Sequence, residues 1–203
     1  MVLSIFIFFY AKEEQISKEQ QQFEGITNDI ANEFERDMQI SLNILNANER
    51  FINASDNVTQ EKFKIFTSKF IELYPNIQSL SWNPKVKREE RKNHEESLHK
   101  QGFKNYFIKE RIMKGQIIPA LERDFYFPVT YIYPYKGNKA AHGFDTYGED
   151  KISNNIRQTT LLRAIDEGVA ITTGRISIVQ AEDQYGLLIY HPVYDKNISE
   201  KSI

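Results

Sequence analysis

The sequence contains no cysteine among its 203 residues, and this absence excludes several kinds of chemistry. Without thiols the chain has no disulfide bonds, no thiolate metal site and no cysteine nucleophile. Charge of one sign is also lacking, because 26 lysines and arginines nearly balance 28 aspartates and glutamates. A net charge of −2 gives no overall attraction to nucleic acid. We therefore expect no nucleic-acid partner.

Long apolar runs are absent as well. The most apolar segment, Val2 to Tyr10, reads VLSIFIFFY and is about half of the ~20 residues that a helix needs to cross a bilayer. It has neither the basic segment nor the small-residue cleavage site of a signal peptide. We interpret residues 1–11 as the outer end of a truncated membrane anchor, with a buried strand as the alternative. Because Ile203 ends a polar tail, we expect the sequence to be a fragment.

Proline is missing between Lys12 and Asn53, and glycine occurs there once. Apolar residues recur every three or four positions in this segment: Phe23, Ile26, Ile30, Phe34, Met38, Leu42 and Leu45. This spacing predicts an amphipathic helix over residues 12–53. A helix of this length that leaves a membrane is a stalk, and its apolar stripe must pack against something. We predict a parallel homodimer through the stalk, and a core helix of a single lobe is the alternative.

The remainder of the chain, residues 54–203, alternates between helical and strand patterns. In order, we expect a helix from Thr59 to the residue before Pro75, a strand over Ile77–Trp82, a charged helix over Lys87–Gln101 that is solvated on its outer face, a short strand over Tyr106–Glu110 and a loop over Arg111–Arg123. This order predicts an α+β fold, with a curved antiparallel sheet and helices packed on one face.

The most aromatic segment is Phe125–Tyr135, which reads FYFPVTYIYPY. Pro128 and Pro134 interrupt it, and two prolines are unsuited to a central strand. We therefore predict a bent edge strand that lines a cavity with Phe127 and Tyr131.

The segment from Gly143 to Tyr194 carries the clearest pattern of elements. A helix with leucines and isoleucine on its apolar side stops at Gly168, which suits a left-handed cap. Two runs rich in β-forming residues follow, Ile171–Val179 and Tyr185–Tyr194. The second run is apolar almost throughout, which predicts a strand covered on both faces. A helix followed by such a hairpin is typical of a cradle for a small molecule.

Motifs for catalysis are missing. His94 and His99 are five positions apart, whereas two metal ligands on one helix face need a spacing of four, so we expect a solvated pair. Neither a serine nucleophile motif nor a phosphate loop is found. The acid pairs at Glu149 and Glu182 lie in turn-like segments. We expect no catalytic residue, no metal and no cofactor.

Several short motifs occur together in a fixed order: Ile77–Val86, Arg88–Glu95, Tyr126–Val129, Tyr131–Pro134, the Gly143–Phe144–Asp145 turn, Ala164-x-x-x-Gly168, Thr172–Gln180 and Gly186–Tyr194. Together they resemble the CHASE domain, an extracytoplasmic sensor module of receptor histidine kinases and cyclases. The resemblance covers about residues 60 to 195. It implies a PAS-like sheet carried by a long N-terminal helix, with ligand in the lobe far from the membrane. Residues 54–203 are then a sensor domain that lacks its C-terminal part.

The resemblance also suggests site residues. In the plant cytokinin receptors an acidic residue on the late helix binds adenine, and Arg157 stands at the matching position. Tyr190 stands where those receptors have a threonine. With the strand positions and the aromatic run, the candidate ligand-binding residues are Phe127, Tyr131, Arg157, Thr173, Val179 and Tyr190. Arginine cannot accept the ring N–H bond, so the match does not extend to cytokinin. Arg157 instead favours an anionic or carbonyl-bearing ligand.

These observations predict the function. We expect a periplasmic or extracellular sensing domain of a membrane-anchored receptor, not itself an enzyme, whose kinase or cyclase output domain lies outside this sequence. Ligand binding is expected to shift the population of conformations of the sensor domain, and the stalk is expected to transmit this change. The alternative is a dimerisation or protein-interaction module without a ligand. An inward-facing Arg157 needs an anion as partner, either a ligand or an acid such as Asp145, Glu149 or Asp150. We expect Asp145 to bind the backbone of its own turn.

Overall fold

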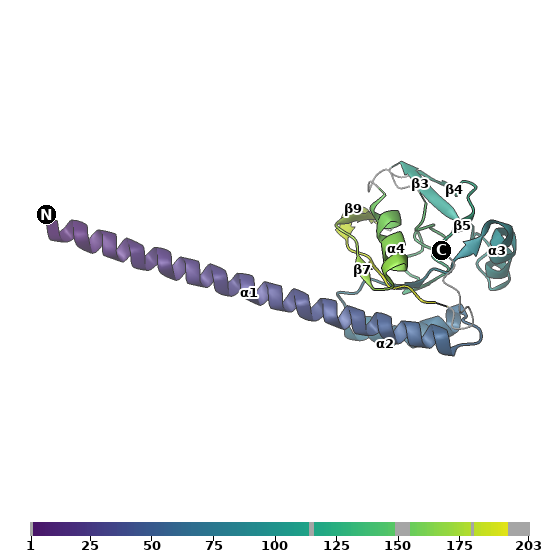
Figure 1. Ribbon diagram of the computed structural model, residues 1–203, viewed down its shortest axis with the longest axis horizontal. Helices are drawn as coiled ribbons and strands as arrows, with labels where there is room; N and C mark the ends of the chain where they lie inside the picture. The colour runs from purple at the N-terminus through teal and green to yellow at the C-terminus, as the bar shows by residue number, and fades with distance from the viewer. Residues whose placement is uncertain (1, 114–115, 149–154, 180, 195–203) are drawn as a thin grey trace. The chain divides into compact units, whose positions relative to one another are not determined.

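A computed structural model of the protein describes residues 2–113, 116–148, 155–179 and 181–194, without the side chains of residues 2–11, 113 and 181–183. The chain divides into two units, residues 1–44 and 45–203, and each is described by itself. A long N-terminal helix is followed by antiparallel strand pairs and shorter helices (Figure 1). The predicted α+β class is confirmed.

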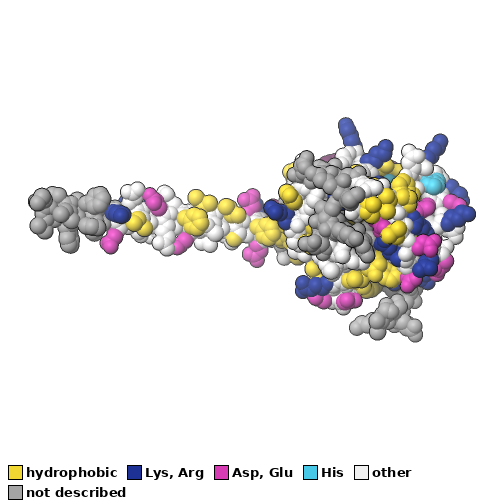
Figure 2. Space-filling view, turned by 90° about the horizontal axis from the view of Figure 1, so that it is seen from above, with side chains coloured by type: hydrophobic (Ala, Val, Ile, Leu, Met, Phe, Trp, Pro, Cys, Tyr) yellow, Lys and Arg dark blue, Asp and Glu magenta, His cyan; other side chains and the backbone are white. Residues whose placement is uncertain are grey.

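Helix α1 runs from Val2 to Ala54 without a break, as the lack of proline predicts. The alternative that residues 2–10 form a strand is wrong, since they belong to this helix. In the first unit five apolar side chains remain between 52% and 70% exposed: Ile16, Phe23, Ile26, Ile30 and Phe34. Figure 2 shows apolar groups recurring along the helix between charged ones. Across the described residues, no helix has an apolar stretch long enough to span a membrane.

Helix α2 (Gln60–Leu73) begins at the predicted cap, where the Thr59 hydroxyl accepts a hydrogen bond from the backbone N–H of Lys62 at 3.3 Å. It packs on the last turns of α1, which belong to the second unit. The rings of Phe51 and Phe66 stack there with centroids 4.4 Å apart. The second unit therefore begins inside α1, before the short polar segment that separates the two helices.

The first strands of the second unit pair two by two. The pairs are β1 (Leu80–Trp82) with β6 (Tyr131–Tyr133), β2 (Val86–Lys87) with β5 (Phe125–Tyr126), and β3 (Lys109–Met113) with β4 (Gln116–Pro119). The β3–β4 hairpin corrects the prediction of a loop over residues 111–123. Pro119 stands at the end of β4, where proline is tolerated, so it does not prevent a strand.

The charged segment after β2 starts as a 3-10 turn, η1 (Arg88–Glu90), and continues as α3 (Arg91–Lys100). Helix α4 (Ile156–Glu167) ends as predicted at Gly168, whose φ of 70° is the left-handed conformation. The Gly168 N–H donates to the carbonyl of Ala164 at 3.0 Å.

A hairpin completes the fold. It consists of β7 (Ile171–Thr172), β8 (Ile176–Ile178), β9 (Ala181–Gly186) and β10 (Ile189–Tyr190), with β7 paired to β10 and β8 paired to β9. Helix α4 lies against β7 and β10 (Figure 1). Leu187 is 47% and Tyr185 63% exposed, so the prediction of a strand covered on both faces is wrong. The hairpin is two strands wide, and its outer side chains face solvent.

Candidate functional site

Helix α4 presents a polar residue to the interior. Its buried side chains, Arg157, Thr160, Leu161 and Ala164, follow the spacing of a single helix face. Arg157 is 3% exposed, and its Nη2 donates a hydrogen bond to the carbonyl of Ser177 on β8 at 2.5 Å. Its guanidinium carbon lies 5.7 Å from the ring centroid of Phe144. Arg157 therefore faces inward, beneath the hairpin.

The ring that Arg157 covers belongs to a buried apolar cluster of Val129, Ile132, Ala141 and Phe144, which we call the Phe144 cluster. Val179, half-buried after β8, packs against this cluster. Two of the six candidate residues, Arg157 and Val179, therefore both contact the Phe144 cluster. Arg157 comes from α4, and Val179 directly follows β8.

Thr173 and Tyr190 lie on the hairpin beside α4. The backbone of Thr173 donates to the Leu188 carbonyl at 2.8 Å, and its hydroxyl accepts from the Leu188 N–H at 3.0 Å. Thr173 is buried, and both bonds to Leu188 extend the pairing of β7 with β10 by one position. Tyr190 is half-buried on β10, opposite Ile171. Tyr190 therefore belongs to a strand that α4 packs against.

Phe127 and Tyr131 lie in other surroundings. Phe127 belongs to an aromatic group with Phe125 and Tyr147, at centroid distances of 5.9 and 6.2 Å. Tyr131 is 6.4 Å from the ring of Phe63 on α2. It is the neighbour of Ile132 on β6, and consecutive strand residues point to opposite faces. Tyr131 therefore points away from the Phe144 cluster.

The turn before α4 is fixed by Asp145, which is completely buried. Its carboxylate accepts hydrogen bonds from the backbone N–H groups of Phe127 at 2.8 Å and Tyr147 at 3.2 Å. It also binds Arg123 at 3.0 Å, and Arg123 pairs with the buried Glu110. Burial raises the pKa of the Asp145 carboxyl, although these donors oppose that effect. The expectation that Asp145 binds the backbone of its turn is confirmed, while Glu149 and Asp150 lie outside the described residues.

Arg123 and Glu110 lie next to the candidate site, through Asp145, and the sequence did not predict them. Glu110 is on β3 and Arg123 follows β4, so the two are separated along the chain from each other and from Asp145. The sequence contains no local spacing that links them. Gly148 completes the group, because a Cβ there would lie 3.0 Å from the Glu110 carboxylate. The network holds the turn that carries Phe144, and so positions the ring under Arg157.

A second polar group surrounds His142. Its Nε2 is 2.9 Å from the Thr130 carbonyl, and its ring lies 4.7 Å from both Phe103 and Tyr106. Burial lowers the pKa of His142 to about 4. His94 joins the group through Tyr106, with a distance of 3.1 Å from Nε2 to the hydroxyl. The expectation that His94 is solvated is therefore wrong, because α3 turns it onto Tyr106.

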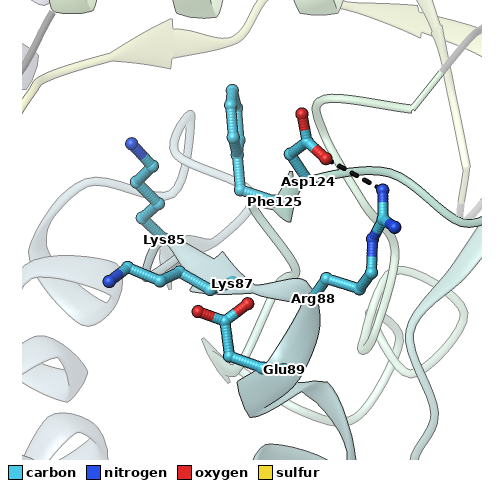
Figure 3. Close-up of a pocket in the computed structure, with 6 residues that line it drawn as sticks. All are labelled: Lys85, Lys87, Arg88, Glu89, Asp124 and Phe125. Atoms are coloured by element: carbon cyan, nitrogen blue, oxygen red, sulfur yellow. Dashed lines mark hydrogen bonds and ion pairs between the residues drawn. The ribbon is translucent and has the colours of Figure 1, made fainter.

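Hollows of the described residues include an open one and a small one. One of about 400 Å³ is lined by Lys85, Lys87, Arg88, Glu89, Asp124 and Phe125 (Figure 3). The other, of about 50 Å³, is lined by ten residues: Leu45, Asn48, Glu49, Ile52, Phe63, Leu80, Ser81, Trp82, His191 and Val193. Neither is lined by any of the six candidate residues. In the part of the chain that the structure describes, no group of three or more acidic or histidine side chains could hold a metal.

Comparison with protein families identifies the chain. The family model described as CHASE domain matches residues 56–202. The chain belongs to the CHASE family. CHASE domains are extracellular sensor domains of signalling receptors, and their role is sensory rather than catalytic. No curated protein matches the sequence.

The CHASE match begins two residues after α1 ends at Ala54. It therefore contains α2, all the strands and α4, together with the six candidate residues. The long helix ends before the matched region begins, so the helix and the matched CHASE region are separate parts of the sequence.

Proposed function

We propose that this CHASE domain senses a small anionic or carbonyl-bearing molecule, bound at the inward face of α4. Arg157 is the principal contact, and Thr173, Val179 and Tyr190 of the hairpin segment are the neighbouring ones. Phe127 and Tyr131, which lie in other surroundings, are proposed as residues that shape the walls of the lobe. The observation that carries the proposal is the position of Arg157, 3% exposed and directed at β8.

A buried guanidinium is a specific recognition group. Arginine is seldom buried without partners, because removing its charge from water is costly. The guanidinium has five N–H donors in a planar fork, and two of them bind a carboxylate side by side. The Phe144 ring below it supplies an apolar surface for the rest of a ligand. This combination favours a small organic acid over a purine base.

Signal transmission is proposed to run through α1. The exposed stripe from Ile16 to Phe34 is suited to a parallel pair of helices, one from each copy of the chain. The segment of residues 2–10 is proposed to join the receptor to its membrane. A ligand that binds one arrangement of the lobe more tightly shifts the population toward it. The output domain that reads this shift, a histidine kinase or a cyclase, is proposed to lie outside the sequence.

The alternative function is a dimerisation or protein-interaction module that has no ligand. The observation that favours it is that the Phe144 cluster is filled by side chains, while the two hollows lie elsewhere. In that case Arg157 is a structural residue that links α4 to β8.

Calorimetric titration of the full chain with small carboxylates, phosphates and purines distinguishes the two functions. We expect at least one acid to bind, and we expect Arg157→Ala to abolish that binding. Arg163→Ala is the matched control, because Arg163 lies on the outer face of α4 and pairs with Glu167. Binding of purines but not acids, or unchanged binding by Arg157→Ala, would overturn the assignment. Absence of binding by every acid would favour the module without a ligand.

A further inference from the structure

The hollow beside β2 and β5 is a second place where this protein presents cations around an aromatic ring. We propose that it binds an aromatic monocarboxylate, independently of the Arg157 site. The hollow has a volume of about 400 Å³ and opens to solvent between the two strands and η1 (Figure 3). Nothing in the proposed sensory role requires this hollow.

Strand alternation builds the hollow. Val86 pairs with Tyr126, and both point into a buried cluster with Ile108 and Ala120. Consecutive strand residues face opposite sides, so Lys85, Lys87 and Phe125 point outward. Lys87 is the direct cross-strand partner of Phe125, and the Lys85 ammonium lies 4.6 Å from the centre of its ring. The position of Lys85 over the ring, and of Lys87 beside it on β2, therefore follows from the register of the core residues behind them.

The Phe125 ring is a fixed platform. It is half-buried, and its centroid lies 4.7 Å from that of Tyr147 and 5.9 Å from that of Phe127. Tyr147 belongs to the turn that Asp145 holds through its backbone N–H. An aromatic ligand would meet a ring already positioned by its neighbours, which lowers the entropic cost of binding.

The opposite wall is an ion pair. Arg88 binds Asp124 through its side chain at 2.8 Å, and its backbone N–H donates to the Asp124 carbonyl at 2.9 Å. The Arg88 Nε also donates to the Arg123 carbonyl at 3.2 Å. In Figure 3 this pair lies on one side of Phe125 and the two lysines on the other. The charge of Asp124 is therefore already balanced.

The charge of the hollow sets the charge of its ligand. Neither Lys85 nor Lys87 forms an ion pair with a carboxylate among the residues that the structure describes. Three cations and two anions line the hollow, so its net charge is positive by one. A monoanion matches this surplus, whereas a polyphosphate carries more negative charge than the hollow balances. A carboxylate between the lysines and a ring on Phe125 would satisfy both features.

Phenylacetate is the probe for this site, measured by calorimetry and by ligand-observed magnetic resonance on the full chain at low salt. We expect saturable binding with a dissociation constant below roughly 10 mM, and about tenfold weaker binding by the Lys85→Met, Lys87→Met double variant. Lys92→Met is the matched control, since Lys92 is an exposed lysine of α3 outside the hollow. Cyclohexylacetate, which has the same charge but no aromatic ring, should bind about threefold more weakly.

The same titration separates this site from the Arg157 site. Phenylacetate should bind Arg157→Ala as well as it binds the wild type. If Arg157→Ala loses phenylacetate binding and the double lysine variant keeps it, the carboxylate binds at the sensor site and this proposal is overturned. No saturable binding at low salt, or equal loss in Lys92→Met and the double lysine variant, would overturn it as well.

Discussion

Arg157 and Lys85 are both cations placed over a phenylalanine ring, but their surroundings differ. Arg157 is buried above Phe144, 5.7 Å from the ring centroid, whereas Lys85 lies in an open hollow, 4.6 Å from that of Phe125. Burial removes solvent screening, so a buried cation needs defined partners and discriminates strongly between ligands. A solvent-exposed cation interacts weakly with a ligand, because water and salt screen its charge. The two proposals accordingly place ligand sensing in the interior and weak binding of acids at the surface.

The largest expected effect concerns the two rings. Phe144→Ala should destabilise the protein by about 3–5 kcal/mol, because it removes a buried side chain from the Phe144 cluster and leaves a cavity. Phe125→Ala should cost about 1 kcal/mol, because that ring is half open to solvent. Chemical denaturation of both variants measures the difference. Equal losses would show that the two rings are equally part of the core.

A second expected effect tests how strongly the interior excludes charge. His142 is neutral when folded, because burial and the nearby Lys109 lower its pKa from the ordinary 6.5 to about 4. The unfolded chain therefore binds more protons between these pH values, and stability falls as the pH decreases from 6.5 to 4. The Thr130 carbonyl faces the ring and opposes this effect, and His94 adds to it. The loss attributable to His142 should total about 3 kcal/mol.

The measurement is the free energy of unfolding as a function of pH for wild type and His142→Gln. Subtracting the two curves cancels the titration of carboxylates common to both proteins. The remaining difference should change between pH 6.5 and 4 and be flat above pH 6.5. A constant difference across that range would show that folding leaves the pKa of His142 unchanged.

The elements that the sequence predicted correctly have local causes. The Thr59 cap, the Gly168 stop and the Asp145 turn each depend on one residue and its immediate backbone. The sequence did not predict the β3–β4 hairpin, because glycine and proline, here Gly115 and Pro119, are typical of loops. Glu110 of β3 is buried and pairs with Arg123, which follows β4, and no spacing in the sequence indicates this contact.

The candidate site was predictable in the same uneven way. Arg157 falls on the inward face of an amphipathic helix, so its burial follows from periodicity together with its neighbours. The separation of Phe127 and Tyr131 from Arg157 depends on where the short strands β5 and β6 end. Strand ends are set by tertiary pairing, and an aromatic run interrupted by prolines does not define them.

A smaller effect on stability is expected in the stalk, where the comparison is between exposed and buried apolar groups. Replacing Ile30 and Phe34 with glutamate should convert a dimer into a monomer, because both side chains are more than half exposed within one chain. The free energy of unfolding of residues 45–203 should change by less than about 0.5 kcal/mol. Sedimentation measures the state of association. A wild-type chain that stays monomeric at high concentration would contradict the predicted dimer.

The smallest effect is expected at the N-terminus. Deleting residues 2–10 should leave the melting temperature of the second unit nearly unchanged, because these residues belong to the other unit of the chain. Solubility should improve, since the deletion removes the most apolar segment. Thermal denaturation followed by circular dichroism checks this result, and a large fall in the melting temperature would show that the segment is part of the folded core.

The most direct test of the sensor account observes the Arg157 guanidinium itself. Magnetic resonance of arginine side chains in nitrogen-labelled protein gives a signal for each ordered guanidinium, and Arg157→Lys identifies the signal that belongs to this residue. On titration with the acid that binds, the Arg157 signal should shift in proportion to occupancy, while that of Arg163 on the outer face of α4 stays in place. Saturable binding of an acid that leaves the Arg157 signal unmoved would contradict the account.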